Sequence, residues 1–224
     1  MLKYKLGTIF LLIIGIFSFR FVTAQTNELP LFGKVIYIDP GHGGSDPGAM
    51  YKEIKEADLN LSVSQKLETK LSELGAIVYL TRYSDYDLSV NHTINRKRSD
   101  LSRRGNIINR SGCDLFLSIH MNAEETGIWR GAEVYYDDIN EENEEIAKSI
   151  QEQLKKYLGS KRNIKKTDVL YLQKRIERPG VLIEAGFLSN SSDRYLLKQE
   201  TYQNKIASAI AQGVLIYLEQ KNSL

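Results

Sequence analysis

From Gly33 onward, short apolar runs of strand length alternate with longer segments whose apolar residues recur at helical spacing. The first run, residues 34–39, is β-branched and aromatic and is closed by Pro40-Gly41, which indicates a buried strand. Such alternation predicts a single α/β domain, over residues 33–220, with a mostly parallel, twisted sheet and helices on both faces. The expected strands are 34–39, 76–81, 114–120, 132–136, 168–172 and 180–185, and the expected helices are 57–74, 99–109, 140–158 and 202–219.

The charge balance becomes informative once the N-terminal segment is set aside. Residues 1–24 hold three basic and no acidic residues, so the rest of the chain carries 27 basic and 28 acidic residues. A chain this close to neutral lacks the positive charge of a nucleic-acid-binding protein, and we expect no nucleic-acid partner. We expect the local basic stretch at residues 161–166 to be a solvated face, with contact to an acidic polymer or a protein partner as the alternative.

Cys113 is the only cysteine of the chain. It excludes an internal disulfide and a thiolate-rich zinc cluster, and we expect it to be a small buried residue ahead of a strand. The hydrophobic share of 42% exceeds what a disordered chain contains, so the chain has enough apolar residues to build a core.

The N-terminal residues 1–24 have the pattern of a secretory signal. Lys3 and Lys5 precede the uncharged residues 6–19, and the small residues near Ala24 suit a cleavage site. As a helix the uncharged run spans about 21 Å, which is short of the roughly 30 Å hydrocarbon core of a bilayer. The alternative is an uncleaved membrane anchor in which Arg20 snorkels to the interface. Either way we expect export, with the domain outside the membrane as a secreted or anchored protein.

Four polar residues lie at or just beyond the ends of predicted strands or at the start of a helix: His42, Glu56, His120 and Glu184. In an open parallel sheet the functional edge is formed by the carboxyl ends of the strands. Two neutral imidazoles and one carboxylate are a ligand set that holds catalytic zinc, with a fourth position for water. A free carboxylate beside them can take a proton from that water and pass it to a leaving nitrogen.

Each of these residues also has a structural interpretation. A histidine at a strand end is often a hydrogen-bonded core residue, Glu56 could be a first-turn helix acid, and Glu53 competes with it as a ligand. Glu184 lies inside an apolar strand, where its desolvation requires a partner such as Arg104. The glycine-rich residues 41–44 could cradle a phosphate, but they lack the P-loop pattern. Two of the three histidines are predicted at one rim of the sheet, which favours a metal site, but the residues alone leave the structural roles open as alternatives.

Six motifs follow one another along nearly the whole chain after the N-terminal segment. They are I-D-P-G-H-G-G-x-D-x-G-A (38–49), E-x-D-L-N-L (56–61), L-x-x-R-x-x-x-x-N (101–109), D-L-F-L-S-I-H-x-N-A (114–123), G-A-E-V-Y-Y (131–136) and P-G-V-L-I-E-A-G-F-L-S-N (179–190). Taken in this order, they resemble the motifs of the zinc-dependent N-acetylmuramoyl-L-alanine amidases, a family of peptidoglycan hydrolases.

The resemblance implies a phosphorylase/hydrolase-like α/β fold and hydrolysis of the amide bond between N-acetylmuramic acid and L-alanine. It implies Zn²⁺ as cofactor, with His42, Glu56 and His120 as metal ligands and Glu184 as the catalytic residue. The E-x-D-L-N-L motif favours Glu56 over Glu53. The implied substrate is the peptidoglycan glycan strand with its peptide stems.

The short architecture, without wall-binding repeats, is similar to the germination-specific members of the family that act on the spore cortex. It implies a role in cortex maturation through formation of muramic δ-lactam, a location facing the wall or the space between the spore membranes, and an accessory protein partner. Only residues 137–140 separate the fourth strand from the next helix, so no autoinhibitory helix is expected there. The alternatives are a vegetative autolysin, a zinc peptidase or deacetylase acting on the wall, and a non-catalytic wall-binding protein that retains the zinc site.

Overall fold

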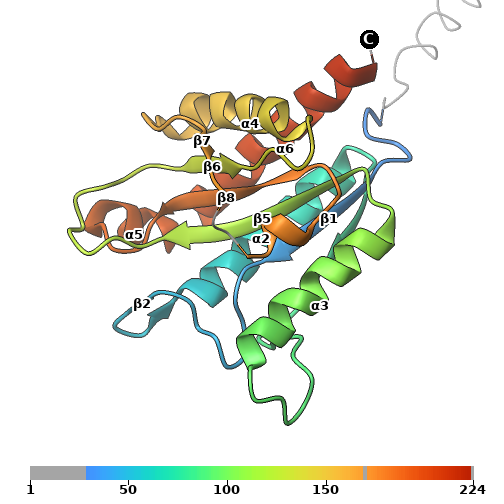
Figure 1. Cartoon of the computed structure of the whole chain (residues 1–224). Helices are drawn as coiled ribbons and strands as arrows, with labels where there is room; N and C mark the ends of the chain where they lie inside the picture. The colour runs from blue at the N-terminus through green and yellow to red at the C-terminus, as the bar shows by residue number, and fades with distance from the viewer. Residues whose placement is uncertain (1–28, 169–170, 223–224) are drawn as a thin grey trace, which may run out of the picture.

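The computed structural model describes residues 29–168 and 171–222, so the proposed signal or anchor at residues 1–24 lies outside the described residues. A six-stranded sheet forms its centre, in the order β4-β1-β5-β8-β6-β7 (Figure 1). Only β6 runs antiparallel to its neighbour β8 among these pairs, which confirms a mostly parallel sheet. The strands are β1 Val35–Pro40, β4 Ile77–Leu80, β5 Leu115–Asn122, β6 Glu133–Tyr136, β7 Lys165–Lys166 and β8 Gly180–Phe187; β2 Met50–Tyr51 and β3 Ile54–Lys55 form a separate hairpin.

Helices cover both faces of the sheet, as predicted. Side chains alternate between the faces along each strand, so Leu117 and Ile119 of β5 join the main core with α2, α4 and α6, while Phe116 packs in a smaller cluster with Ile108 of α3 on the opposite face. Figure 1 shows α3 on the other side of the sheet from α4 and α6. The helices are α2 Glu56–Glu73, α3 Arg96–Ser111, α4 Asn143–Leu158, α5 Ser191–Leu197 and α6 Glu200–Asn222, with a 3-10 turn, η1, at Gln173–Arg175.

The predicted helix ends agree with the observed ones to within a few residues. Gly112 caps α3 in the left-handed conformation with φ 68°, and Asn95 begins that helix by accepting a hydrogen bond from the Arg98 amide at 3.1 Å. At the end of α2, Gly75 has φ 97°, so the glycine stop signals were correctly interpreted.

The strand expected at residues 168–172 was wrong. Asp168 lies in a bend and residues 171–172 in a turn before η1, while residues 169–170 lie outside the described residues. Leu172 is buried in the small cluster against α3, where its side chain packs a loop against the face of the sheet. The edge strand beside β6 is instead β7, Lys165–Lys166. Its two residues are polar and exposed, so no run of apolar residues marks it in the sequence.

The seven-residue helix α5 was not predicted, and its start is marked by Asn190, whose side chain accepts hydrogen bonds from the Ser192 and Asp193 amides. Between residues 29 and 222, apart from the two undescribed positions, no helix combines the length and apolar character needed to cross a bilayer.

Candidate metal centre

The structure brings His42, Glu56 and His120 together at the carboxyl edge of the sheet. His42 follows β1, Glu56 is the first residue of α2, and His120 lies in β5. His42 Nε2 is 3.2 Å from Glu56 Oε2, and His120 Nδ1 is 3.0 Å from Glu56 Oε1. One ligand atom from each residue lies within 4.8 Å of the other two, which suits a single ion held at about 2 Å from each. Their role as metal ligands stays a prediction that this geometry supports.

Two buried arginines fix the loop that carries His42. Arg82 donates to the carbonyl oxygens of Pro40 and Gly41 at 3.0 and 2.9 Å. Arg104 donates to the carbonyl oxygens of Pro40 and His42 at 2.8 and 2.6 Å. His42 has φ 61°, a left-handed conformation that is uncommon for a residue with a side chain and that persists only where the surroundings hold it. The arginines therefore impose the backbone shape that aims the imidazole.

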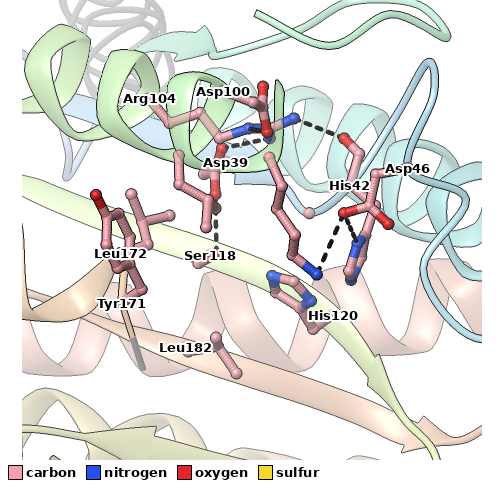
Figure 2. A pocket seen from close by; sticks show the side chains of 13 residues that line it. Asp39, His42, Asp46, Asp100, Arg104, Ser118, His120, Tyr171, Leu172 and Leu182 are labelled. Atoms are coloured by element: carbon pink, nitrogen blue, oxygen red, sulfur yellow. Dashed lines mark hydrogen bonds and ion pairs between the residues drawn. The ribbon is translucent and has the colours of Figure 1, made fainter. Parts of the chain in front are cut away.

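Arg104 is in turn held by two carboxylates, as Figure 2 shows. Its guanidinium lies 2.9 Å from Asp39 Oδ1 and 2.8 Å from Asp100 Oδ2, and Asp39 also accepts from Ser118 Oγ at 3.0 Å. Burial alone would raise the pKa of Asp39, but the Arg104 charge outweighs it and holds the pKa below its usual range. The suggested pairing of Arg104 with Glu184 was wrong, because these aspartates take the guanidinium.

Glu56 is oriented by backbone and side-chain donors. Its carboxylate accepts from the Ala49 amide at 2.9 Å, from Asn60 Nδ2 at 3.1 Å and from the Met121 amide at 3.2 Å. Burial raises the pKa of Glu56, but the hydrogen bonds and charges of the two histidines hold it well below the usual range. Glu53 is exposed, so the structure favours Glu56 as the carboxylate of the cluster.

Asp46 orients His42 from the side opposite Glu56. Its Oδ2 lies 2.9 Å from His42 Nδ1, which leaves Nε2 facing the cluster. A carboxylate behind an imidazole is the usual outer partner of a metal-binding histidine, because it fixes the ring and its tautomer. Burial lowers the pKa of His42, but hydrogen bonds to Glu56 and Asp46 outweigh it and raise the pKa.

Two glycines leave room for the side chains of the cluster. A Cβ on Gly48 would lie 2.5 Å from Glu56 Oε2, and a Cβ on Gly41 would lie 2.4 Å from His120 Nε2. Only glycine at these positions leaves room for the ligand side chains. Two imidazoles, an ionised carboxylate and an outer carboxylate are the donor set of a catalytic zinc site, so the residues present fit zinc.

Glu184 lies beside the cluster on β8. It is the register partner of His120 on β5 and of Glu133 on β6. Its Oε2 atom is buried and has no hydrogen-bond partner among the described residues. Burial, followed by the charges of Glu56 and Glu133, raises the pKa of Glu184 well above its usual value. A carboxylate in this state can take up and release a proton, and its catalytic role stays a prediction.

A cavity of about 240 Å³ adjoins the two histidines (Figure 2). The sheet contributes Leu182, α3 contributes Lys97, and the loop before η1 contributes Tyr171. Lys97 Nζ is 3.7 Å from Asp46 Oδ2, and its side chain is 68% exposed, so one cation stands at the mouth of the cavity.

Several residues of the site were missed from sequence. Asp46 and Asn60 contact the predicted ligands His42 and Glu56, and both are letters of the family motifs at 38–49 and 56–61, a signal that could have pointed to them. Arg82 holds the loop of His42 and lies outside these motifs, where nothing in its local pattern distinguishes it from a surface arginine. Glu133 could have been found, because it lies in an apolar strand just as Glu184 does and is only 2% exposed.

A mostly parallel α/β sheet with a His-Glu-His cluster and the buried carboxyl of Glu184 at its carboxyl edge defines a candidate metal-dependent hydrolase. The family model for N-acetylmuramoyl-L-alanine amidases matches residues 36–215. The chain belongs to this enzyme family.

Relatives and solved structures agree with this assignment. The germination-specific N-acetylmuramoyl-L-alanine amidase of Bacillus subtilis (strain 168) is 40% identical over 227 residues, covering 98% of this chain and 95% of the relative. The LytC amidase of the same organism is 36% identical over 199 residues, 87% of this chain but 38% of LytC. The CwlD amidase of Clostridioides difficile, solved in complex with the GerS lipoprotein, superposes with a TM-score of 0.80 at 40% identity, covering 84% of this chain and 100% of that chain. The predicted fold is thereby confirmed.

Proposed function

We propose that this protein is a zinc-dependent amidase that hydrolyses the bond between the lactyl group of N-acetylmuramic acid and L-alanine in spore-cortex peptidoglycan. Family membership supports the reaction. One observation carries the catalytic assignment: the buried Oε2 of Glu184, without a hydrogen-bond partner among the described residues, lies next to the His-Glu-His cluster. An unpaired buried carboxylate is costly for folding, so its presence at this edge points to use in catalysis.

In this proposal His42, Glu56 and His120 hold the zinc ion, and Asp46 keeps the His42 ring in place. When bound, zinc polarises the scissile carbonyl and makes water nucleophilic at neutral pH. The cavity beside the histidines receives part of the substrate.

Glu184 performs the proton transfers. Its Oε2 takes a proton from the attacking water and delivers it to the nitrogen of L-alanine as the amide bond breaks. Because burial raises the pKa of Glu184, the carboxyl holds that proton more readily than an exposed glutamate would. No covalent enzyme intermediate is required. Cys113, the alternative nucleophile, is 2% exposed, and burial raises the pKa of its thiol.

The biological setting of the proposal is the forming spore. The 40% identity to the Bacillus subtilis germination-specific amidase supports a role in germination. We propose that this role is removal of stem peptides before muramic δ-lactam formation. In this setting residues 1–24 direct export, residues 33–220 form the catalytic domain, and the N-terminus can attach the protein to the membrane. Because CwlD was solved with the GerS lipoprotein, a lipoprotein of the same compartment is the proposed accessory partner. Vegetative wall turnover is the alternative, since the chain is also similar to LytC, an amidase whose name carries no link to germination.

Mass spectrometry of digested peptidoglycan tests the reaction. The full chain is incubated with cortex and with vegetative peptidoglycan, with added zinc or with a chelator. Release of intact stem peptides beginning with L-alanine, only with zinc and mainly from cortex, is the expected result. Shorter peptides would instead indicate a peptidase, loss of acetyl groups a deacetylase, and sedimentation with the wall without products a binding protein. N-terminal sequencing of the exported protein tests cleavage after Ala24.

A further inference from the structure

Trp129 lies in the connection between β5 and β6, next to Ile128, with 52% of its surface exposed. It is the only tryptophan of the chain. A large aromatic ring left half in water, beside an isoleucine that is 74% exposed, forms an apolar surface at the edge of the sheet that carries the cluster.

The ring is held in place from one face by Arg162. The guanidinium carbon of Arg162 lies 5.1 Å from the Trp129 ring centroid and 5.5 Å from that of Phe187. Arg162 is itself fixed, because its Nη2 and Nε lie 2.6 and 2.8 Å from Glu133 Oε2. The expectation that residues 161–166 form only a solvated face was therefore wrong for this arginine.

Glu133 holds the guanidinium of Arg162 in one position. It is 2% exposed, and its other oxygen accepts from Tyr135 Oη at 2.8 Å and from Asn122 Nδ2 at 3.2 Å. A buried carboxylate with donors on both oxygens has one preferred arrangement. The position of Arg162, and through it the orientation of Trp129, follows from that arrangement.

The backbone around Trp129 is also tied to the segment after β8. Asn190 Nδ2 donates to the Gly127 carbonyl at 2.8 Å, and the Gly131 amide donates to Asp193 Oδ2 at 2.8 Å. A ring that is ordered before a ligand arrives loses little conformational freedom on binding. The Trp129 ring is thus preorganised for contact with a ligand.

The position of this surface relative to the reacting groups suggests what binds there. Glu133, Glu184 and His120 are register partners across β6, β8 and β5, and neighbouring strands lie about 4.8 Å apart. Trp129 stands on the β6 side of this row, whereas the cavity with Lys97 stands on the side of β1, β5 and α3. The scissile amide has a sugar on its carbonyl side and a peptide on its nitrogen side, so the two sides must receive different chemistry.

We propose that Trp129 stacks against a sugar ring of the glycan strand, and that the peptide stem enters the cavity beside Lys97. The C–H faces of a pyranose are apolar and match an aromatic plane, while the carboxylates of a stem match an exposed ammonium group. This assignment rests on the proposed amidase function and gives the substrate a single direction across the site.

Because Trp129 is the only tryptophan, its fluorescence reports on this contact directly. The probes are stem-free glycan oligosaccharides and, separately, free stem peptide, each titrated into the zinc-loaded full chain. We expect a saturable change in emission with the oligosaccharides and none with the peptide. An unchanged emission with the oligosaccharides, or a response to the peptide, would overturn the assignment.

A variant pair provides a second readout. Trp129→Ala removes the stacking surface and should lower kcat/KM on glycan strands roughly 2- to 10-fold, mainly through KM, and Trp129→Phe should restore most of it. Phe32→Ala removes an 80% exposed aromatic ring elsewhere on the chain and should change nothing. If Trp129→Ala releases stem peptides with the kcat/KM of the wild-type chain, the proposal for Trp129 is overturned. Failure of the amidase function itself would appear differently, as no stem release by the wild-type chain.

Discussion

Glu184 on β8 and His120 on β5 are register partners on adjacent parallel strands, and the imidazole at that position faces Glu56 at 3.0 Å. The sheet thereby places Glu184, whose Oε2 has no hydrogen-bond partner among the described residues, beside a preassembled His-Glu-His cluster. Side chains mounted on strands are more precisely placed than side chains on loops, which suits a reaction in which water and proton acceptor must be aligned.

Replacing Glu184 with glutamine should abolish turnover and leave the metal in place. The amide cannot accept the proton from water, so we expect kcat to fall by roughly 10²- to 10⁴-fold. Zinc content, measured by atomic spectroscopy, should stay at the wild-type level because Glu184 is not one of the clustered ligands. Glu53→Gln is the matched control, since this acid is exposed, and it should retain both turnover and zinc. Retained activity in Glu184→Gln would remove the residue from the mechanism.

Replacing Asp46 with asparagine should weaken metal binding. The hydrogen bond from His42 Nδ1 loses its charged acceptor, and loss of such an outer partner typically costs 10- to 100-fold in metal affinity. Competition with a zinc-binding dye measures the change. The exposed Asp138→Asn change serves as the reference and should leave affinity as it is. Equal affinities for the two variants would mean that Asp46 does not support the ligand.

The closeness of Gly41 to His120 gives a steric prediction. A Cβ at position 41 would lie 2.3 Å from His120 Cε1, so Gly41→Ala must displace the ring. We expect both Gly41→Ala and His120→Ala to lose zinc. Gly105 lies within α3, and a Cβ there would meet Leu172 Cδ1 at 3.6 Å and Arg175 Cβ at 3.7 Å, which is ordinary contact. Gly105→Ala should therefore stabilise the helix by about 0.5–1 kcal/mol with full zinc content. Zinc content and thermal unfolding of the two variants, compared side by side, check both statements.

The sequence was sufficient for those parts of the site that follow from strand ends. His120 ends an apolar run and Glu184 interrupts one, and the rule that functional residues gather at the carboxyl edge of a parallel sheet predicted both at that edge. Their pairing as register partners is a finding of the structure. The choice between Glu53 and Glu56 was not available from spacing, because both lie near the helix start, and it required the family motif or the observed contacts. Asp46, Arg82 and the Arg162–Trp129 contact depend on how loops fold over the sheet edge, which local patterns do not specify. The misplaced strand at residues 168–172 has the same origin, since an apolar run can hold a loop as well as form a strand.

The buried pair of Asp39 and Arg104 should make stability depend on acid pH. The pKa of Asp39 is lower in the folded protein than in the unfolded chain, so its contribution is present above the unfolded value of about 3.9 and is lost as the pH falls through the folded value. Asp39→Asn leaves Arg104 buried with one carboxylate fewer, which should cost about 3 kcal/mol in the free energy of unfolding at pH 7. Urea unfolding of both proteins with a chelator present measures the difference without a contribution from metal. That difference should shrink below about pH 4, where wild-type Asp39 begins to lose its advantage over the unfolded chain. Asp138→Asn, on the exposed surface, is the control and should show no such difference at either pH. If the loss of unfolding free energy in Asp39→Asn is as large at pH 3 as at pH 7, the ionised form of Asp39 is not what stabilises the loop of His42.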